Sequence, residues 1–71
     1  MGYRGITRVA RARAAKGLTQ TELGQLADTS ARTIRRLENG ETRPQLTTAY
    51  RIALVLGLSL EDVLGEDEAT A

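Results

Sequence analysis

A tight break between two short helices is the feature that most constrains the fold of this 71-residue chain. The run TQTE at residues 19–22 matches a capping box, in which the threonine hydroxyl accepts from one free helix amide and the glutamate reaches back to another. The helix that begins there should end near Ala27. Asp28 tolerates unusual backbone angles and can make the break, Ser30 is a strong N-cap for a second helix, and Gly40 can close that helix. The sequence therefore predicts two helices held at a fixed angle by a short turn.

Three further helices are expected around this pair, and no stretch shows the period-two alternation of a strand. They are predicted from Ile6 to Gly17, from Gln45 or Leu46 to Leu56, and over residues 60–64. Apolar residues at helical spacing predict the side chains that face the core: Val9, Ala12, Leu18, Leu23, Leu26, Ala27, Ile34, Leu37, Leu46, Ala49, Ile52, Ala53 and Leu56. The fold class is therefore all-α. One compact five-helix domain is expected over residues 6–64, with a flexible N-terminal arm over residues 1–5 and a disordered acidic tail over residues 65–71.

The absence of cysteine and histidine narrows the chemistry of the chain. Without these residues there is no disulfide framework, no thiolate or imidazole metal site and no Ser-His-Asp triad. We therefore expect no enzymatic activity, no metal, no cofactor and no small-molecule ligand. The first residues lack the apolar run of a signal peptide, and no stretch reaches membrane-spanning length, so we expect a cytoplasmic location and no membrane partner.

Cations stand at an unusual place on the second of the paired helices. Arg32, Arg35 and Arg36 lie close to its start, where the helix dipole disfavours positive charge. Local rules of this kind tend to be broken at functional sites. Residues 1–51 hold all ten Lys and Arg with four acids, a balance of +6, whereas residues 52–71 hold five acids and no base, a balance of −5. Solvated surface charge is the alternative, but the pattern favours a side that faces nucleic acid and an acidic opposite end.

An ordered set of motifs runs through almost the whole domain. It comprises Gly17-Leu18-Thr19-Gln20, Ser30 with Thr33-Ile34, Leu37-Glu38-Asn39-Gly40, Arg43-Pro44 and the run LGLSLEDVL at residues 56–64. In this order and spacing, the chain resembles the Cro/lambda-repressor-like helix-turn-helix family, also called the XRE type. The resemblance covers about residues 6–64. It implies a DNA-binding domain with the helix-turn-helix at helices 2 and 3, helix 3 in the major groove, and usually a two-fold dimer on a palindromic operator.

The resemblance assigns base reading to the start of helix 3. The matching positions are Ala31, Arg32 and Arg36, and the two arginines are four residues apart on one helix face. Arginine donates two hydrogen bonds to O6 and N7 of guanine, so the half-sites should contain guanine, while Ala31 can offer only a methyl contact. Arg35 lies at the edge of this face, where either a base or a phosphate contact is open to it.

The resemblance also implies phosphate contacts on both sides of helix 3, from Gln20, Asn39 and Arg43. Hydroxyls at helix N-termini suit phosphate oxygens, which adds Thr19, Ser30 and Thr33 as candidates. Thr19 and Ser30 are needed as caps in any case, and Asn39 could simply close its helix. Both roles therefore stay open for these residues.

Two further features of the resemblance concern the fold rather than DNA. Arg13 and Glu38 occupy positions where the family often forms a partly buried ion pair between helices 1 and 3, and loss of one partner would leave an unpaired charge. Gly24 stands where the family usually has alanine, a small residue that lets helix 3 pack closely. Glycine keeps this fit but costs about 1 kcal/mol of helix propensity.

Apolar residues in excess of the expected core predict an interface with a second copy of the chain. Tyr50 and Leu54 lie four apart on a face that adjoins the core stripe, and Leu58 and Leu60 follow nearby. The family favours this region for dimerisation, so a homodimer is expected. The alternative is that so small a domain uses every large side chain internally.

The charge pattern and the resemblance together predict a sequence-specific regulator of transcription. Its partner would be double-stranded DNA with a palindromic operator and guanine in each half-site, which would associate the protein with the nucleoid. A dimeric repressor that occludes a promoter is the simplest mechanism, and activation through an acidic patch on helix 5 is the alternative. A second functional class is an antitoxin-like module that binds a protein partner and uses DNA binding for autoregulation.

Overall fold

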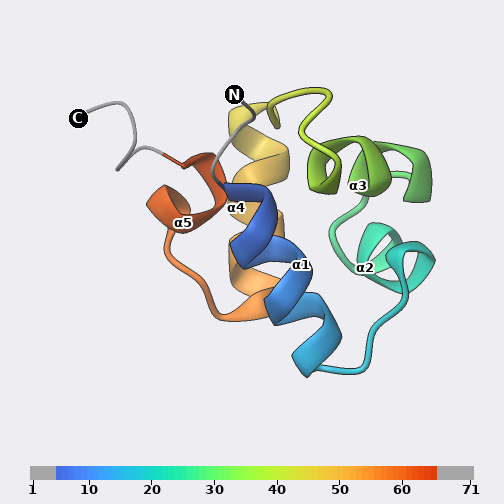
Figure 1. The fold of residues 1–71 in the computed structure, drawn as a ribbon. Coiled ribbons are helices and arrows are strands. Elements are labelled where there is room, and N and C mark those ends of the chain that lie inside the picture. The colour runs from blue at the N-terminus through green and yellow to red at the C-terminus, as the bar shows by residue number, and fades with distance from the viewer. Residues whose placement is uncertain (1–4, 66–71) are drawn as a thin grey trace.

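The computed structural model describes residues 5–65, and within them the chain forms five α-helices (Figure 1). The helices are α1 (Gly5–Ala15), α2 (Gln20–Leu26), α3 (Ala31–Glu38), α4 (Leu46–Leu56) and α5 (Leu60–Leu64). Residues 5–65 contain no strand, so the all-α prediction is confirmed. None of the helices in this range is long and apolar enough to span a bilayer. The expected arm and tail fall largely on residues 1–4 and 66–71, which lie outside the described residues.

Side-chain caps fix where three of the helices begin. Thr19 Oγ1 accepts from Glu22 N at 3.0 Å, and Glu22 Oε1 accepts from Thr19 N at 2.8 Å, which completes the capping box of α2. Ser30 caps α3 by accepting from Thr33 N at 3.0 Å. Ser59 forms a second capping box at the start of α5. Each cap satisfies a helix amide that has no partner within its own helix, so the helix starts are defined by local sequence.

The turn between α2 and α3 depends on Asp28 and Gly24. Asp28 takes a φ of 59°, in the left-handed region that aspartate enters more readily than most residues. The turn folds back on α2, where Thr29 N donates to Gly24 O at 2.7 Å. A Cβ on Gly24 would lie 2.9 Å from Thr29 O and 3.0 Å from the carbonyl carbon of Ser30. Glycine therefore lets the backbone of the turn lie directly against α2, and this close approach sets where α3 begins.

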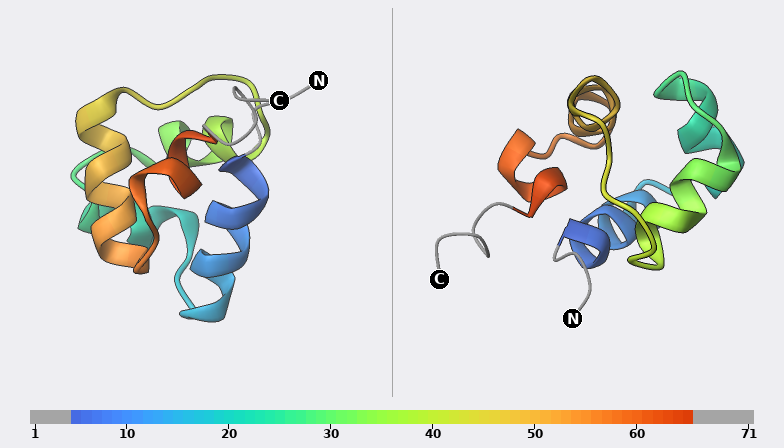
Figure 2. Two further views of the ribbon diagram at one scale, coloured as in Figure 1. Left: turned by 90° about the vertical axis from the view of Figure 1, so that its left-hand side faces the viewer. Right: turned by 90° about the horizontal axis from the view of Figure 1, so that it is seen from above.

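One apolar core joins the helices. Its buried side chains are Val9, Leu23, Ala27, Ile34, Leu37, Ala49, Ile52, Ala53, Leu56 and Val63. Ala12 and Leu18 are partly buried and pack against this core. The front view and the view from above both place α2 and α3 on one side of α1 and α4, with α5 on the opposite side (Figure 1, Figure 2). This arrangement leaves α3 at the periphery of the domain.

Two residues expected in the core are exposed instead. Leu26 is 59% exposed and Leu46 is 63% exposed, so the prediction was wrong for both. The buried face of α2 consists of Leu23 and Gly24, and the turn to α3 packs against it at Gly24. Leu26 lies beside that face rather than on it. Leu46 precedes the exposed Tyr50 and Leu54 by four and eight residues, so it shares their stripe of α4 rather than the core stripe.

Candidate nucleic-acid interface

The outer face of α3 is rich in arginine because two buried residues fix how the helix is rotated. Ile34 and Leu37 are buried and anchor α3 to the core. With 3.6 residues per turn, the opposite face carries Arg32, Arg35 and Arg36, and all three are exposed. Arg35 and Arg36 lie in the last turn of α3, where the helix dipole favours cations, so the prediction that all three stand at the helix start was wrong for these two. The structure therefore brings three of the predicted DNA-contacting residues together on one exposed helix face.

Ala31, the remaining residue predicted to contact bases, is the first residue of α3. It is half-buried, because its backbone lies close to Gly24 at the turn. Its methyl group is the only side-chain atom it can offer at this end of the helix. The first turn of α3 is thus held close to α2, while the arginines extend from the outer face.

Arg36 has an acidic neighbour on the loop that follows α3. Its Nε lies 3.6 Å from Glu41 Oε1, and both side chains are about half exposed. Glu41 Oε2 also accepts from Asn39 Nδ2 at 3.3 Å. One carboxylate therefore contacts both Arg36, which is predicted to contact a base, and Asn39, which is predicted to contact a phosphate. Sequence reasoning missed Glu41. The signal that could have found it is Gly40, because a Schellman closure at a C-terminal glycine returns the next residue to the last turn of the helix.

Gln20 is held by an ion pair that joins α1 to α3. Arg13 Nε lies 2.6 Å from Glu38 Oε2, and Arg13 Nη2 lies 2.9 Å from Glu38 Oε1. Gln20 Nε2 donates to the same Oε1 at 3.1 Å, and Arg13 Nη1 donates to Leu18 O at 2.8 Å. The hydrogen bond to Glu38 raises the pKa of Arg13 above its ordinary value, burial opposes this rise, and the charge of Glu38 adds to it. The network joins the start of α2 to α1 and to the last residue of α3.

The three hydroxyl candidates all have internal hydrogen bonds. Thr19 Oγ1 and Ser30 Oγ accept from helix amides in their capping role. Ser30 Oγ also donates to Thr33 Oγ1 at 3.0 Å. A hydroxyl has one hydrogen to donate, so within this pair it is Thr33 that can donate to a phosphate oxygen.

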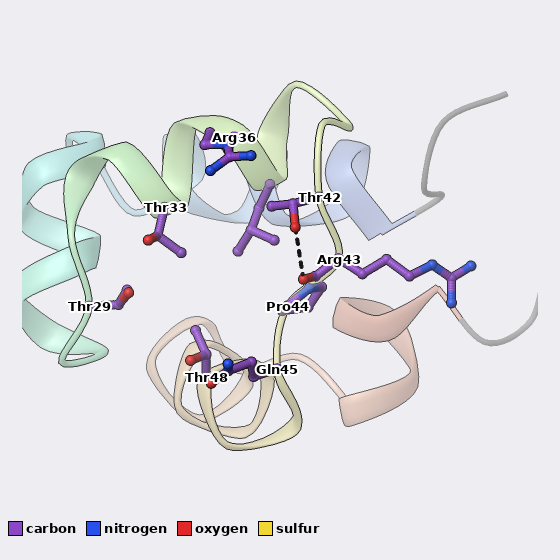
Figure 3. Close-up of a pocket in the computed structure, with 9 residues that line it drawn as sticks. Thr29, Thr33, Arg36, Thr42, Arg43, Pro44, Gln45 and Thr48 are labelled. Carbon is purple, nitrogen blue, oxygen red and sulfur yellow. Dashed lines mark hydrogen bonds between the residues drawn. The ribbon is translucent and has the colours of Figure 1, made fainter.

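A polar cavity of about 290 Å³ lies between α3, the following loop and the start of α4 (Figure 3). It is lined by Thr29, Thr33, Arg36, Leu37, Thr42, Arg43, Pro44, Gln45 and Thr48. In Figure 3, the side chain of Arg43 runs away from Thr33 and Thr48, so this predicted phosphate contact does not point into the cavity. Sequence reasoning missed the other polar lining residues, because their spacing carries no signal and only the fold brings them beside α3: Thr29, Thr42, Gln45 and Thr48.

The four residues expected at a dimer interface fall into two groups. Tyr50 and Leu54 are 56% and 65% exposed. Leu58 and Leu60 are partly buried and pack against the core. The apolar surface that remains exposed on α4 is therefore a stripe of Leu46, Tyr50 and Leu54, which we call the α4 stripe.

Comparisons with known proteins match nearly the whole of the described chain. A model of the Helix-turn-helix family matches residues 9–63. Two relatives from Archaeoglobus fulgidus, each named an uncharacterized HTH-type transcriptional regulator, are 39% identical to this chain over 62 residues. That stretch covers 87% of this chain, and 89% and 87% of the two relatives. The resemblance carried by the sequence motifs is thus confirmed, and the chain belongs to the XRE-type helix-turn-helix family of transcriptional regulators.

Proposed function

We propose that this protein is a sequence-specific transcriptional regulator that reads double-stranded DNA with α3. The observation that carries the proposal is the exposed face of Arg32, Arg35 and Arg36, held outward by the buried Ile34 and Leu37. The major groove admits an α-helix, and each guanine presents O6 and N7 there as paired acceptors. We assign Arg32 and Arg36 to guanine, because each can donate two hydrogen bonds to that pair.

Residues on both sides of α3 would position it through the DNA backbone. Gln20 begins α2, while Asn39 and Arg43 follow α3, so these phosphate contacts would flank the base-reading residues. Thr33 adds a hydroxyl donor from α3 itself, and Arg35 adds a cation at the edge of the reading face. Contacts of this kind set the register of a protein on DNA and carry no sequence information themselves. Sequence preference is therefore expected to come from Arg32 and Arg36, with a methyl contact from Ala31.

We assign the α4 stripe to a homodimer. Its members, Leu46, Tyr50 and Leu54, are spaced by four residues. Two antiparallel copies of α4 with a two-fold axis at Tyr50 would therefore bring Leu46 against the partner subunit's Leu54. A two-fold interface uses the same patch on both subunits, and this spacing is self-complementary. A dimer of this kind requires a palindromic operator, and occlusion of a promoter would then repress transcription by binding alone, without a catalytic step.

Selection of bound duplexes from a random DNA pool at physiological salt tests the proposal. We expect enrichment of a palindrome with guanine in each half-site and half-site centres about 10 bp apart. Glu61→Gln, which changes a charge on α5, should enrich the same sequence, whereas the double variant Arg32→Ala, Arg36→Ala should lose the guanine preference. Salt-sensitive binding without enrichment would contradict the proposal, and would favour an antitoxin-like module that takes its specificity from a protein partner.

A further inference from the structure

We infer that Glu41 is a specificity-determining residue that restrains Arg36 from binding DNA phosphates where guanine is absent. The inference rests on the DNA-reading role proposed for α3. It starts from an acid that stands on a basic surface: Glu41 Oε1 lies 3.6 Å from Arg36 Nε, and Glu41 Oε2 accepts from Asn39 Nδ2 at 3.3 Å. A carboxylate at this place opposes the approach of a polyanion, so its presence calls for a physical reason.

Stability does not supply that reason. The side chains of Arg36 and Glu41 are 46% and 54% exposed, and an ion pair this exposed contributes little to folding. The end of α3 is closed by the backbone instead, with Glu41 N donating to Arg36 O at 2.9 Å and Gly40 N donating to Leu37 O at 3.1 Å. These hydrogen bonds do not involve the carboxylate. Any polar residue at position 41 could keep the same closure.

The geometry of the ion pair leaves room for base reading. Glu41 lies on the Nε side of the guanidinium, and arginine carries five N–H donors. Nη1 and Nη2 can therefore make the paired contact to guanine O6 and N7 while Glu41 stays beside Nε. A phosphate bound by Arg36 would be a second anion on the same guanidinium, so it would compete with the Glu41 carboxylate for that charge.

Operator and random DNA would therefore respond to Glu41 in different ways. On an operator, Arg36 can keep its acidic neighbour and still reach guanine. On random DNA, binding depends on cations that neutralise phosphates, and each such contact releases counterions. Glu41 weakens that binding by competing for Arg36, so it lowers affinity for random DNA more than affinity for the operator. Specificity is a difference between two affinities, and opposing the wrong complex widens it.

Glu41→Gln tests the inference, because glutamine keeps an acceptor for Asn39 and loses only the charge. We expect affinity for random DNA to rise about threefold, while affinity for the selected operator changes by less than about twofold. The plot of log affinity against log salt on random DNA should steepen by about 0.9, the value for one added phosphate contact. Glu61→Gln is the matched control, since it removes one negative charge on α5 and should change neither affinity.

A double-mutant cycle separates this role from a general charge effect. With Arg36→Ala in place, Glu41→Gln should no longer raise affinity for random DNA. An equal rise on operator and random DNA, or a rise that persists without Arg36, would overturn the inference alone. Failure of the wild-type protein to prefer any selected sequence over random DNA would overturn the proposed function, and the inference with it.

Discussion

Removal of one partner of the Arg13–Glu38 ion pair should destabilise the domain strongly. Glu38 is 7% exposed and Arg13 is 19% exposed, and two Arg13 nitrogens contact the two carboxylate oxygens at 2.6 and 2.9 Å. Arg13→Met keeps much of the side-chain length but leaves a buried carboxylate beside the Gln20 amide at 3.1 Å. Breaking a fully buried pair in this way costs about 3–5 kcal/mol. Because one fifth of Arg13 is exposed to water, we expect a loss of about 2–4 kcal/mol in the free energy of unfolding.

Urea unfolding, followed by circular dichroism, measures this loss. A domain of this size has a total stability of about 4–10 kcal/mol, so the midpoint should move far toward lower urea. The double variant Arg13→Met, Glu38→Met should lose less than the sum of the two single changes, by about 2 kcal/mol, because it leaves no unpaired charge. Arg11→Met, at an exposed position of α1, is the control and should change stability by less than about 0.5 kcal/mol. Single variants within about 1 kcal/mol of wild type, with additive effects, would show that the ion pair does not hold α1 to α3.

Three further predictions concern the pH dependence of that pair, the turn and the dimer. The fold raises the pKa of Arg13, so the contribution of charged Arg13 to stability is complete below the unfolded pKa and is lost only as pH rises through the folded pKa. The difference in unfolding free energy between wild type and Arg13→Met should therefore stay constant from about pH 7 to pH 10. A decline of this difference within that range would contradict the prediction. Gly24→Val should lower the free energy of unfolding by about 1–3 kcal/mol, because the valine Cβ would meet backbone atoms of the turn at 2.9–3.0 Å. Gln25→Ala, on the exposed side of α2, is the control and should have little effect. Equal urea midpoints for the two variants would show that the turn can move aside. Tyr50→Lys should turn a dimer into a monomer in analytical ultracentrifugation without unfolding it, and a dimer that persists would place the interface away from the α4 stripe.

Helix positions could be predicted because the signals for them are local. Thr19, Ser30 and Ser59 each act on an amide three residues ahead, so their effect does not depend on the rest of the fold. The rotation of short helices could not be predicted as well. Leu26 and Leu46 each lie close enough to an apolar stripe to belong to it by periodicity, and only the packing of neighbouring helices decides that they stay in water.

The candidate site shows the same division. Arg32 could be found from the sequence because a cation near a helix start breaks a local rule, and Arg36 because it lies one turn further on, on the face opposite the buried Ile34 and Leu37. Glu41 could not, because its meeting with Arg36 follows from backbone closure after α3 rather than from residue spacing. The polar cavity could not be predicted from the sequence either, because its lining residues come from the turn, the loop and α4 and are brought together only by the fold.

The base preference of an Arg36→Ala variant shows whether α3 reads DNA sequence through its outer arginines. The measurement is selection from a random DNA pool with wild type, Arg36→Ala and Arg43→Ala in parallel. We predict that Arg36→Ala loses guanine preference at one position of each half-site and binds the operator more weakly by about 1–3 kcal/mol. Arg43→Ala should weaken binding to operator and random DNA alike and leave the selected sequence unchanged. If Arg36→Ala selects the same sequence as wild type, with equal losses on operator and random DNA, Arg36 does not read bases.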